Sequence, residues 1–538
     1  MVATANPLAT RAGYDVLRAG GNAVDAAIAV QLVLGLVEPQ SSGLGGGAFL
    51  LLHDARTRRL TAYDGRETAP AAAKADRFLG PDGKPLAFYD AVIGGRSVGV
   101  PGIARLLEAV HRDHGRLRWS RLFERAITLA EDGFPVSARL HALIAAETHW
   151  SQARARDYFL TREGTAPPVG TMLRNPAYAR TLRTLASEGA QPFYDGPIAD
   201  DIVRTANEAA PNPGDLTRRD LAGYAIKVRA PVCGPYREYR VCGMPLPSSG
   251  GTTVLQVLGM LAPYDIASMG PASFWSVHFL SEAERLAFAD RGVYLADPDF
   301  VSPPPGLLDV DYLRARSRLI KVNRSLGVAA PGDPSRERER AEDPVLGTDG
   351  AAEFPSTSHV AIVDRDGNAV SMTTTIEDQF GSRLMTEGGF LLNNELTDFS
   401  FLPVDDGKPV ANRVEAGKRP RSSMAPTIAY DARGRVAIVI GSPGGSAIIN
   451  YVVKTLVALI DWKLDPQAAI ALPNFGSRNG PTELENHTAV AALQPRLEAL
   501  GHRTAVIEQT SGVQAIVRTS HGFLGGADPR REGVVLGD

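Results

Sequence analysis

The sequence predicts an α+β fold in which a sandwich of β-sheets is covered by helices on both sides. Strand-like segments occur near the start of the chain and again from about residue 358 onward. Helix-rich sequence lies between them, at residues 103–225 and 272–330. Two strand-rich portions separated in this way bury their apolar faces by packing sheet on sheet, with helices outside.

The hydrophobic pattern of the first half predicts each element in turn. Residues 22–36 are almost continuously apolar and predict a buried helix. Residues 48–53 and 59–63 are expected to be paired strands around a short polar turn. The other expected elements are amphipathic helices at 102–112, 119–132 and 137–149, strand at 220–242, a turn at 245–251 and a helix at 252–261.

The second half is expected to open with a β-hairpin. Apolar residues alternate from Val360 onward, a tight Asp366-Gly367 turn follows, and a second run ends at Thr375. Before it, residues 336–343 alternate Glu with Arg and residues 344–355 are rich in Gly, Pro and Ala, which predicts an exposed linker. Further elements are expected as strands at 427–430, 435–441 and 514–519 and as helices at 447–462 and 494–500.

Composition excludes two classes of function. The chain has 538 residues, with 57 Lys and Arg against 60 Asp and Glu, a net charge of −3. Because no basic block is present, nucleic acid is not expected as a partner. The longest apolar stretch, residues 23–37, carries Asp25 and Gln31 and suits a buried helix better than a membrane span.

Two cysteines, Cys233 and Cys242, flank a predicted turn between two short strands. They suit either a cross-strand disulfide in an oxidising compartment or two free buried thiols. Metal binding is not expected there, because no His or Cys pair lies nearby at ligand spacing.

The segment Ser356-Thr357-Ser358-His359 lies where the first strand of the hairpin begins. A Thr at this position can act as a nucleophile if the preceding peptide bond is cut. The freed α-amino group, with a pKa of about 8, then serves as the base.

Several other motifs accompany this segment. They are Gly20-Gly21-Asn22-Ala23-Val24-Asp25, Gly43-Leu44-Gly45-Gly46-Gly47, Arg66-Glu67-Thr68-Ala69-Pro70, Asn393-Asn394-Glu395, Arg421-Ser422-Ser423 and Ser442-Pro443-Gly444-Gly445. In this order they closely resemble the γ-glutamyltranspeptidase (glutathione hydrolase) family of N-terminal-nucleophile hydrolases, over nearly the whole chain. The resemblance implies an αββα sandwich made by two subunits of one precursor, a large subunit of residues 1–356 and a small subunit of residues 357–538.

The resemblance also implies the catalytic residues. Thr357 matches the family's Thr-X-His pattern, whereas Ser356 and Ser358 have no His two positions on, so the cut is expected between Ser356 and Thr357. Thr375 matches a Thr that hydrogen-bonds the nucleophile, and His359 is expected to be structural. The backbone N–H groups of Gly444 and Gly445 match the family's oxyanion hole.

Substrate-binding residues follow from the same match. Arg66 is expected to hold an α-carboxylate, because its guanidinium fork can donate two hydrogen bonds to one carboxylate. Ser422 and Ser423 match the serine pair that binds the same group. Glu395 and Asp398 supply negative charge for an α-ammonium.

The chain departs from the family pattern at two places. Glu377 stands where many transpeptidases carry Asn, so a third acid is expected to strengthen ammonium binding or to alter acyl specificity. Residues 399–418 form a shorter segment than in members with a lid over the site, and it contains Phe401 but no Tyr or Trp. An open site admits water, so hydrolysis is expected to exceed transfer.

These observations predict a self-processing γ-glutamyl hydrolase/transferase that uses glutathione or a related donor and passes the acyl group to water, an amino acid or a peptide. No metal or organic cofactor is implied. The alternatives are a glutaryl- or cephalosporin-type acylase of the same fold and a non-catalytic binding protein on this scaffold. No signal peptide is visible in the chain. Because many bacterial relatives are exported and Met1 falls near their mature start, a trimmed periplasmic or secreted protein is expected, with a cytoplasmic one as the alternative.

Overall fold

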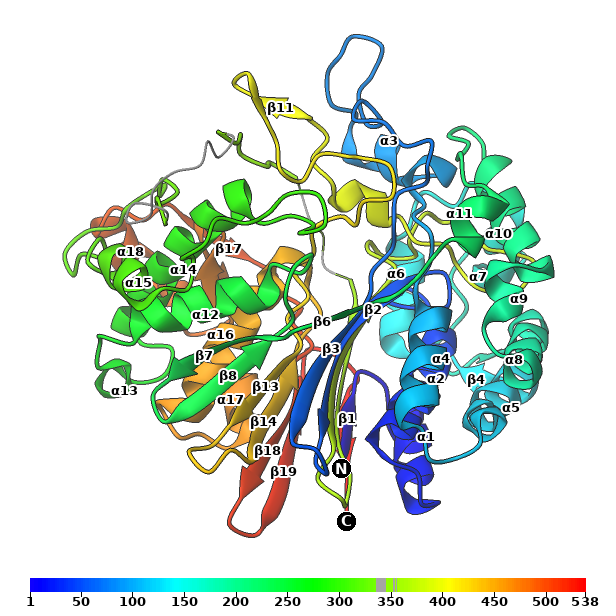
Figure 1. Ribbon diagram of the computed structural model, residues 1–538, viewed down its shortest axis with the longest axis horizontal. Helices are drawn as coiled ribbons and strands as arrows, with labels where there is room; N and C mark the ends of the chain where they lie inside the picture. Colours follow the sequence, from blue (N-terminus) through cyan, green and yellow to red (C-terminus); the bar gives the residue numbers. More distant parts are fainter. Residues whose placement is uncertain (335–344, 352–353, 355) are drawn as a thin grey trace.

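Two antiparallel sheets lie face to face and form the centre of the computed structural model, which describes residues 1–334, 345–351, 354 and 356–538 (Figure 1). The first sheet has the order β20-β1-β9-β10-β2-β3-β6 and the second β19-β18-β14-β13-β8-β7. Strands β9 and β10 of the first sheet contact β14 of the second. Of the expected linker at 336–355, residues 345–351 and 354 are described, and the rest lies outside the described residues.

The bounds of the strands are as follows. The first sheet comprises β1 (Val2–Thr4), β2 (Gly47–Asp54), β3 (Arg59–Gly65), β6 (Lys227–Arg229), β9 (Ser358–Val363), β10 (Ala369–Thr375) and β20 (Val534–Leu536). The second comprises β7 (Val232–Tyr236), β8 (Tyr239–Gly243), β13 (Thr427–Tyr430), β14 (Val436–Gly441), β18 (Gln514–Thr519) and β19 (Gly522–Ala527).

Helices cover the outer face of each sheet, on opposite sides of the molecule in Figure 1. Against the first sheet lie α1 (Pro7–Arg18), α2 (Ala23–Val37) and α4 (Ile103–His114), with α2 against β9 and β10; α5 (Glu124–Asp132) packs on α2, and α8 (Pro176–Glu188) packs on α5. Against the second lie α12 (Gly250–Leu261), α16 (Ile448–Ile460) and α17 (Pro466–Ala471), with α12 against β7 and β8; α14 (Phe274–Tyr294) packs on α12. The α+β sandwich is therefore confirmed as four layers.

The central strands of the first sheet, β9, β10 and β2, are buried on both faces. On β2, Phe49 and Leu51 belong to the core between the sheets, whereas Leu50 and Leu52 pack into the core shared with α2. Alternate side chains of a strand point to opposite faces, so one strand serves two cores. Helix α2 starts where Asn22 caps it, and the Asp25 side chain accepts the Asn22 backbone N–H in return.

Most of the expected elements are present, and the main differences are the following. The segment expected as strand from residue 220 begins with the helix α11 (Arg218–Ala222), and strand starts only at β6. The helix expected at 137–149 ends earlier, as α6 (Ala138–Ala146). Strands β1, β19 and β20 were not anticipated, because β1 and β20 have three residues each and β19 is rich in glycine.

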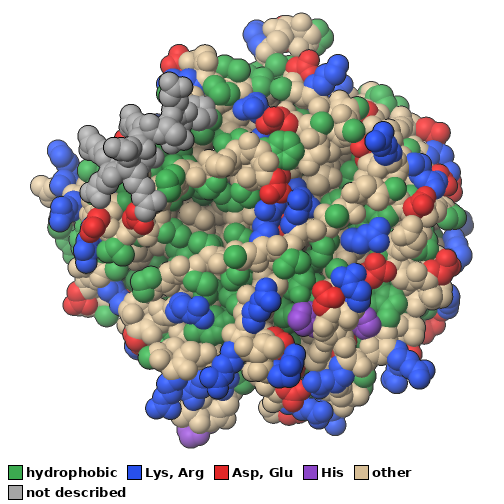
Figure 2. Space-filling model, viewed as in Figure 1, with side chains coloured by type: hydrophobic (Ala, Val, Ile, Leu, Met, Phe, Trp, Pro, Cys, Tyr) green, Lys and Arg blue, Asp and Glu red, His purple; other side chains and the backbone are tan. Residues whose placement is uncertain are grey.

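Three smaller findings complete the fold. Cys233 and Cys242, paired across β7 and β8, form a disulfide, so the free-thiol alternative does not hold. Among the described residues, no helix is both long and apolar enough to cross a membrane. On the face shown in Figure 2, charged side chains of both signs are interspersed.

Candidate active site

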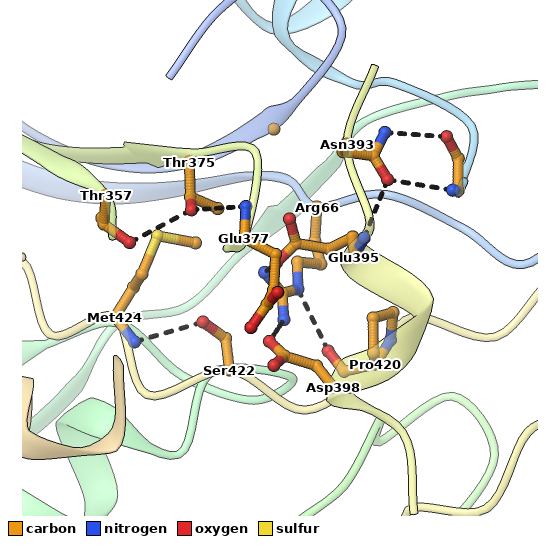
Figure 3. Close-up of polar contacts among 12 residues, drawn as sticks. Arg66, Thr357, Thr375, Glu377, Asn393, Glu395, Asp398, Pro420, Ser422 and Met424 are labelled. Atoms are coloured by element: carbon orange, nitrogen blue, oxygen red, sulfur yellow. Dashed lines mark hydrogen bonds and ion pairs between the residues drawn. The ribbon is translucent and has the colours of Figure 1, made fainter. Parts of the chain in front are cut away.

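The hairpin of β9 and β10 brings Thr357 and Thr375 together. Ser358 pairs with Thr374 in the ladder, so Thr357, one residue before the strand, lies opposite Thr375. The Thr357 hydroxyl donates to Thr375 Oγ1 at 3.1 Å, and Thr375 Oγ1 also accepts the Glu377 N–H at 2.9 Å (Figure 3). Thr375 thus fixes the position of the Thr357 oxygen.

The backbone around Thr357 is held on both sides of the Ser356–Thr357 bond. Ser356 Oγ donates to the carbonyl of Gln40 at 2.9 Å, and Arg531 Nη1 donates to the carbonyl of Thr357 at 3.0 Å. Thr357 has φ of 84°, in the left-handed region. A β-branched residue is strained there, so conformational strain is stored at this bond.

His359 lies on the same strand face as Thr357 but bonds elsewhere. Its Nδ1 lies 2.9 Å from Thr373 Oγ1 on the partner strand. Full burial lowers the pKa of His359 to about 3, so the ring is neutral. This geometry suits a structural hydrogen bond inside the sandwich.

Gly444 and Gly445 form a turn between the end of β14 and the start of α16. Both have positive φ, 136° and 57°. A Cβ on Gly444 would come within 2.6 Å of the Tyr451 ring, so a side chain is excluded there for steric as well as conformational reasons. Gly445 lines the same cavity as Thr357.

Arg66 lies at the centre of the predicted binding residues and is 1% exposed. Its two terminal nitrogens form ion pairs with Glu395 and Asp398 (Figure 3). Nε donates to the carbonyl of Pro420 at 3.2 Å, and Nη2 also donates to that of Arg421 at 3.0 Å. The predicted carboxylate anchor and the predicted ammonium anchors are thus in direct contact.

Two acidic side chains of the site, Glu377 and Glu395, carry raised pKa values. Burial, reinforced by the charges of Asp398, Asp378 and Glu395, raises the pKa of Glu377 well above its usual range. Burial also raises the pKa of Glu395, despite the attraction of Arg66. Glu377 accepts a hydrogen bond from Asn394 Nδ2. No cation is among the groups that shift the pKa of Glu377, so without a ligand cation this carboxyl group favours its protonated form, whereas Glu395 is paired with Arg66.

Ser422 and Ser423 lie on the loop that leads to β13, which passes beside Arg66. The Ser422 hydroxyl accepts the Met424 N–H at 3.1 Å. The Ser423 hydroxyl accepts from Arg291 Nη2 at 2.6 Å. Both serines line the cavity that Thr357 faces.

One cavity of about 20 Å³, room for about one water molecule, joins these groups. It is lined by Arg66, Phe354, Thr357, Thr375, Glu377, Glu395, Asp398, Ser422, Ser423, Met424, Gly445 and Ile448. The structure therefore brings together every predicted catalytic and binding residue except Gly444, which lines the adjoining cavity.

Comparison with known proteins shows which family the chain belongs to. Residues 9–538 match the gamma-glutamyltranspeptidase family. The chain belongs to that family. A glutathione hydrolase proenzyme from Bacillus subtilis strain 168 is 35% identical over 100% of this chain and 91% of the relative. An acylase, the ACY 1 proenzyme of Pseudomonas sp. strain SE83, is also 35% identical, over 98% of this chain and 91% of the relative.

The crystal structure of a cephalosporin acylase from Bacillus halodurans superposes with a TM-score of 0.84 at 28% identity, covering 99% of this chain and 95% of that one. The αββα fold of N-terminal-nucleophile hydrolases is thus confirmed.

Three residues of this gamma-glutamyltranspeptidase-family site were not predicted from the sequence. Asn394, inside a recognised motif, holds Glu377. Glu67, next to Arg66, is buried, and desolvation raises its pKa to about 7. Arg531, near the C-terminus, fixes the Thr357 carbonyl. No local pattern signals Arg531, because 174 positions separate it from Thr357.

A metal site does not fit the one His-rich group found among the described residues, His278, Glu282 and His502. The two rings hydrogen-bond each other at 2.7 Å, and Glu282 is occupied by Arg285 and by the backbone of Leu326. A cation would have to replace these bonds beside a guanidinium. The three side chains therefore form a buried network of structural hydrogen bonds.

Proposed function

We propose that the chain is a self-processing γ-glutamyl hydrolase and transferase that uses Thr357 as its nucleophile. The observation that supports this most strongly is the single cavity shared by the Thr357 hydroxyl, Arg66 with its two carboxylates, the serine pair and the Gly445 turn. Glutathione and related γ-glutamyl amides are the donors, in keeping with the name of the Bacillus subtilis relative.

Maturation begins with the Thr357 hydroxyl attacking the carbonyl carbon of Ser356. The acyl group shifts from the amide nitrogen to Oγ1, and water hydrolyses the resulting ester, giving a carboxylate on Ser356 and a free amine on Thr357. After the cut no peptide group precedes Thr357, so its φ is no longer constrained and the strain is released. Residues of this kind store about 1–3 kcal/mol, which favours the cut.

In the mature protein, the α-amine of Thr357 accepts the proton of its own hydroxyl while Oγ1 attacks the γ-carbonyl carbon of the donor. The backbone N–H groups of Gly444 and Gly445 stabilise the oxyanion. The leaving amine departs with the proton, and water or an amine then attacks the γ-glutamyl ester on Thr357. Thr375 keeps the oxygen oriented through both half-reactions.

Charge balance favours a donor that ends in an amino acid. In the structure Arg66 is paired with Glu395 and Asp398. A zwitterion exchanges these contacts: its carboxylate takes the guanidinium and its ammonium takes the acids. No net charge is buried in this exchange, whereas a bare carboxylate would add one.

The segment after Asp398 supports hydrolysis as the main outcome. Its two aromatic side chains, Phe399 and Phe401, pack in a separate apolar cluster, where Phe401 stacks on Phe78 with ring centroids 4.7 Å apart. They are therefore not available to cover the nucleophile. The disulfide of Cys233 and Cys242 supports an oxidising location such as the periplasm or the cell exterior.

The test is a denaturing gel with N-terminal sequencing, followed by a donor assay. Two fragments are expected, the smaller starting at Thr357, with release of glutamate from γ-glutamyl anilide. Thr357→Ala should stay uncut and inactive, and Thr357→Ser should mature more slowly because it keeps a hydroxyl. A fragment that starts at Ser356 or Ser358 would overturn the assignment, and an uncut wild-type protein would favour the non-catalytic alternative.

An acylase acting on glutaryl amides is the second candidate, because acylases are among the full-length relatives. Glutaryl and γ-glutamyl anilides differ only in the α-amine, so their relative rates separate the two functions. Preference for the γ-glutamyl donor supports the first proposal, and equal rates support the acylase.

A further inference from the structure

Asp349 belongs to the proposed large subunit, before the cut, but its side chain is buried against a residue of the proposed small subunit. Its Oδ2 lies 2.7 Å from Arg421 Nη2, and the side chains of Asp349 and Arg421 are 1% and 2% exposed. The Asp349 backbone is held as well, because its N–H donates to the carbonyl of Gly292 in α14 at 2.9 Å. Losing either partner of a buried ion pair strands the other charge, so this pair fixes both side chains.

Asn412 joins this ion pair to two backbone groups. Its Nδ2 donates to Asp349 Oδ2 at 2.8 Å and to the carbonyl of Asp398 at 2.7 Å. Its Oδ1 accepts the backbone N–H of Arg421 at 2.9 Å. Asp349, Asn412 and Arg421 therefore form a clip that connects the two proposed subunits.

The clip contacts both halves of the proposed donor-binding site. The carbonyl of Arg421 accepts from Arg66 Nη2 at 3.0 Å, so the clip fixes the guanidinium proposed for the donor carboxylate. The clip also fixes the backbone of Asp398, whose carboxylate pairs with Arg66 and is proposed for the ammonium (Figure 3). The Thr357 hydroxyl is held separately, by Thr375. Loosening the clip should therefore disturb donor binding and leave the nucleophile in place.

We propose that Asp349 is a positioning residue for donor binding, and that its segment stays bound to the small subunit after the cut. This inference rests on the proposed function. The cut separates Ser356 from Thr357 and breaks none of the contacts of the clip. Besides Arg66, the large subunit thus supplies the carboxylate that holds the substrate-binding loops of the small subunit.

Asp349→Asn tests the clip by removing the charge while keeping the shape of the side chain. For the matured variant, KM for γ-glutamyl anilide should rise roughly 10-fold, the range of a hydrogen bond to a charged group. The value of kcat should stay within about twofold, because binding lost equally from substrate and transition state changes KM alone. Arg421→Gln should have the same effect, and the double variant no larger one, because the two side chains act as a pair.

Asp405→Ala is the matched control. Asp405, in β11 (Val404–Asp405), accepts the N–H of Thr348 with its Oδ2 at 2.9 Å, so it holds the same segment as the clip does. Among the described residues it forms no hydrogen bond with the clip itself. This variant should keep the wild-type KM. An equal rise of KM in Asp405→Ala and Asp349→Asn would overturn the role of Asp349, because any contact to the segment would then suffice.

Trimming with a carboxypeptidase that accepts proline tests, without any activity assay, whether the segment stays bound. The mass of the large subunit shows where trimming from the new C-terminus at Ser356 ends. In the native mature wild type it should end before Asp349, whereas in Arg421→Gln it should remove Asp349 as well. Removal of Asp349 from the wild type would show that the segment leaves after the cut, which contradicts the inference.

A denaturing gel and the wild-type assay separate the possible failures. If the wild type is uncut or releases no glutamate, the proposed function fails, and this inference with it. If the wild type is active but KM is unchanged in Asp349→Asn, only this inference fails. Should Asp349→Asn not mature, Arg421→Lys, which keeps the charge without the fork, should show the rise in KM. If neither variant matures, Asp349 serves folding and not donor positioning, and the inference is wrong.

Discussion

At the scale of the residue, the site depends on how Arg66 is held. Two backbone carbonyls, of Pro420 and Arg421, accept from Nε and Nη2 independently of the carboxylates. In the proposed exchange, these carbonyls keep the guanidinium plane fixed while Glu395 and Asp398 exchange Arg66 for a ligand ammonium. A preorganised fork of this kind loses little freedom when it binds a carboxylate.

Replacing Arg66 should therefore mainly weaken donor binding. We expect Arg66→Ala to lower kcat/KM by the equivalent of about 2–4 kcal/mol, because the donor carboxylate and the two acids lose a charged partner. Arg66→Lys should recover only part of this, since a point charge cannot reproduce the fork. Steady-state kinetics on a γ-glutamyl donor gives the answer, with the gel pattern as a control for maturation. Activity within about threefold of wild type in Arg66→Ala would place the carboxylate elsewhere.

Glu377 should set the discrimination between γ-glutamyl and glutaryl donors. Its pKa is raised by burial and by three neighbouring acids, so a bound ammonium stabilises its ionised form. The wild type should reject the glutaryl donor by roughly 100-fold, as sites built for a polar group reject ligands that lack it. In Glu377→Asn this ratio should fall, while self-cleavage continues because maturation involves no ammonium. An unchanged ratio would remove Glu377 from ammonium recognition.

At the scale of the element, the hairpin of β9 and β10 combines the proposed nucleophile with a buried polar pair. His359 of β9 pairs with Thr373 of β10, and Thr357, one residue before β9, contacts Thr375. The same register that places these two threonines together also places His359 against Thr373. The apolar core around the His359 ring keeps it neutral in the folded protein. Unfolding therefore takes up a proton at His359, and the fold loses stability by it, only in acid.

The stability of this hairpin should depend on pH. The folded pKa of His359 is lowered to about 3, whereas the unfolded value is about 6.5. The unfolded chain therefore binds more protons below pH 6.5, and stability is lost as pH falls from there toward 3. At pH 5 the loss amounts to about 2 kcal/mol. Denaturant unfolding of uncut Thr357→Ala should show it, and adding His359→Gln should flatten that part of the profile. Parallel pH profiles in the two proteins would contradict this assignment.

Local patterns predicted the hairpin and most helices, because turn chemistry and periodicity depend on neighbouring residues. The residues that meet in the cavity were predicted from the resemblance to the γ-glutamyltranspeptidase family instead. They did not predict contacts between distant segments. Arg531 reaches Thr357 across 174 positions, and Arg66 reaches Glu395 across 329. Cys233 and Cys242 remained ambiguous for a different reason: their spacing is equally compatible with paired and free thiols until the strand register is known.

At the scale of the whole molecule, the proposed cut falls inside a shared sheet. Strands β9 and β10, after the cut, lie between β1 and β2, from before it. Strand β20, at the far end of the chain, pairs with β1 at its beginning. Strands of each half therefore form their backbone hydrogen bonds with strands of the other half. The interface between the two halves is buried like the core of a domain.

The two fragments should consequently remain one particle after the cut. Under native conditions, size-exclusion chromatography should give the same elution volume for mature wild type and for uncut Thr357→Ala, a chain of 57.3 kDa. Denaturing electrophoresis of that same peak should show two bands for wild type and one for the variant. The fragments should separate only in denaturant, and each should fail to refold alone because its central strands lack their neighbours. Dilution should not dissociate them, since the interface is buried like a core and not like a transient contact. If the fragments elute separately in native buffer, the interleaved sheet does not hold the mature protein together and the proposed cut must lie elsewhere.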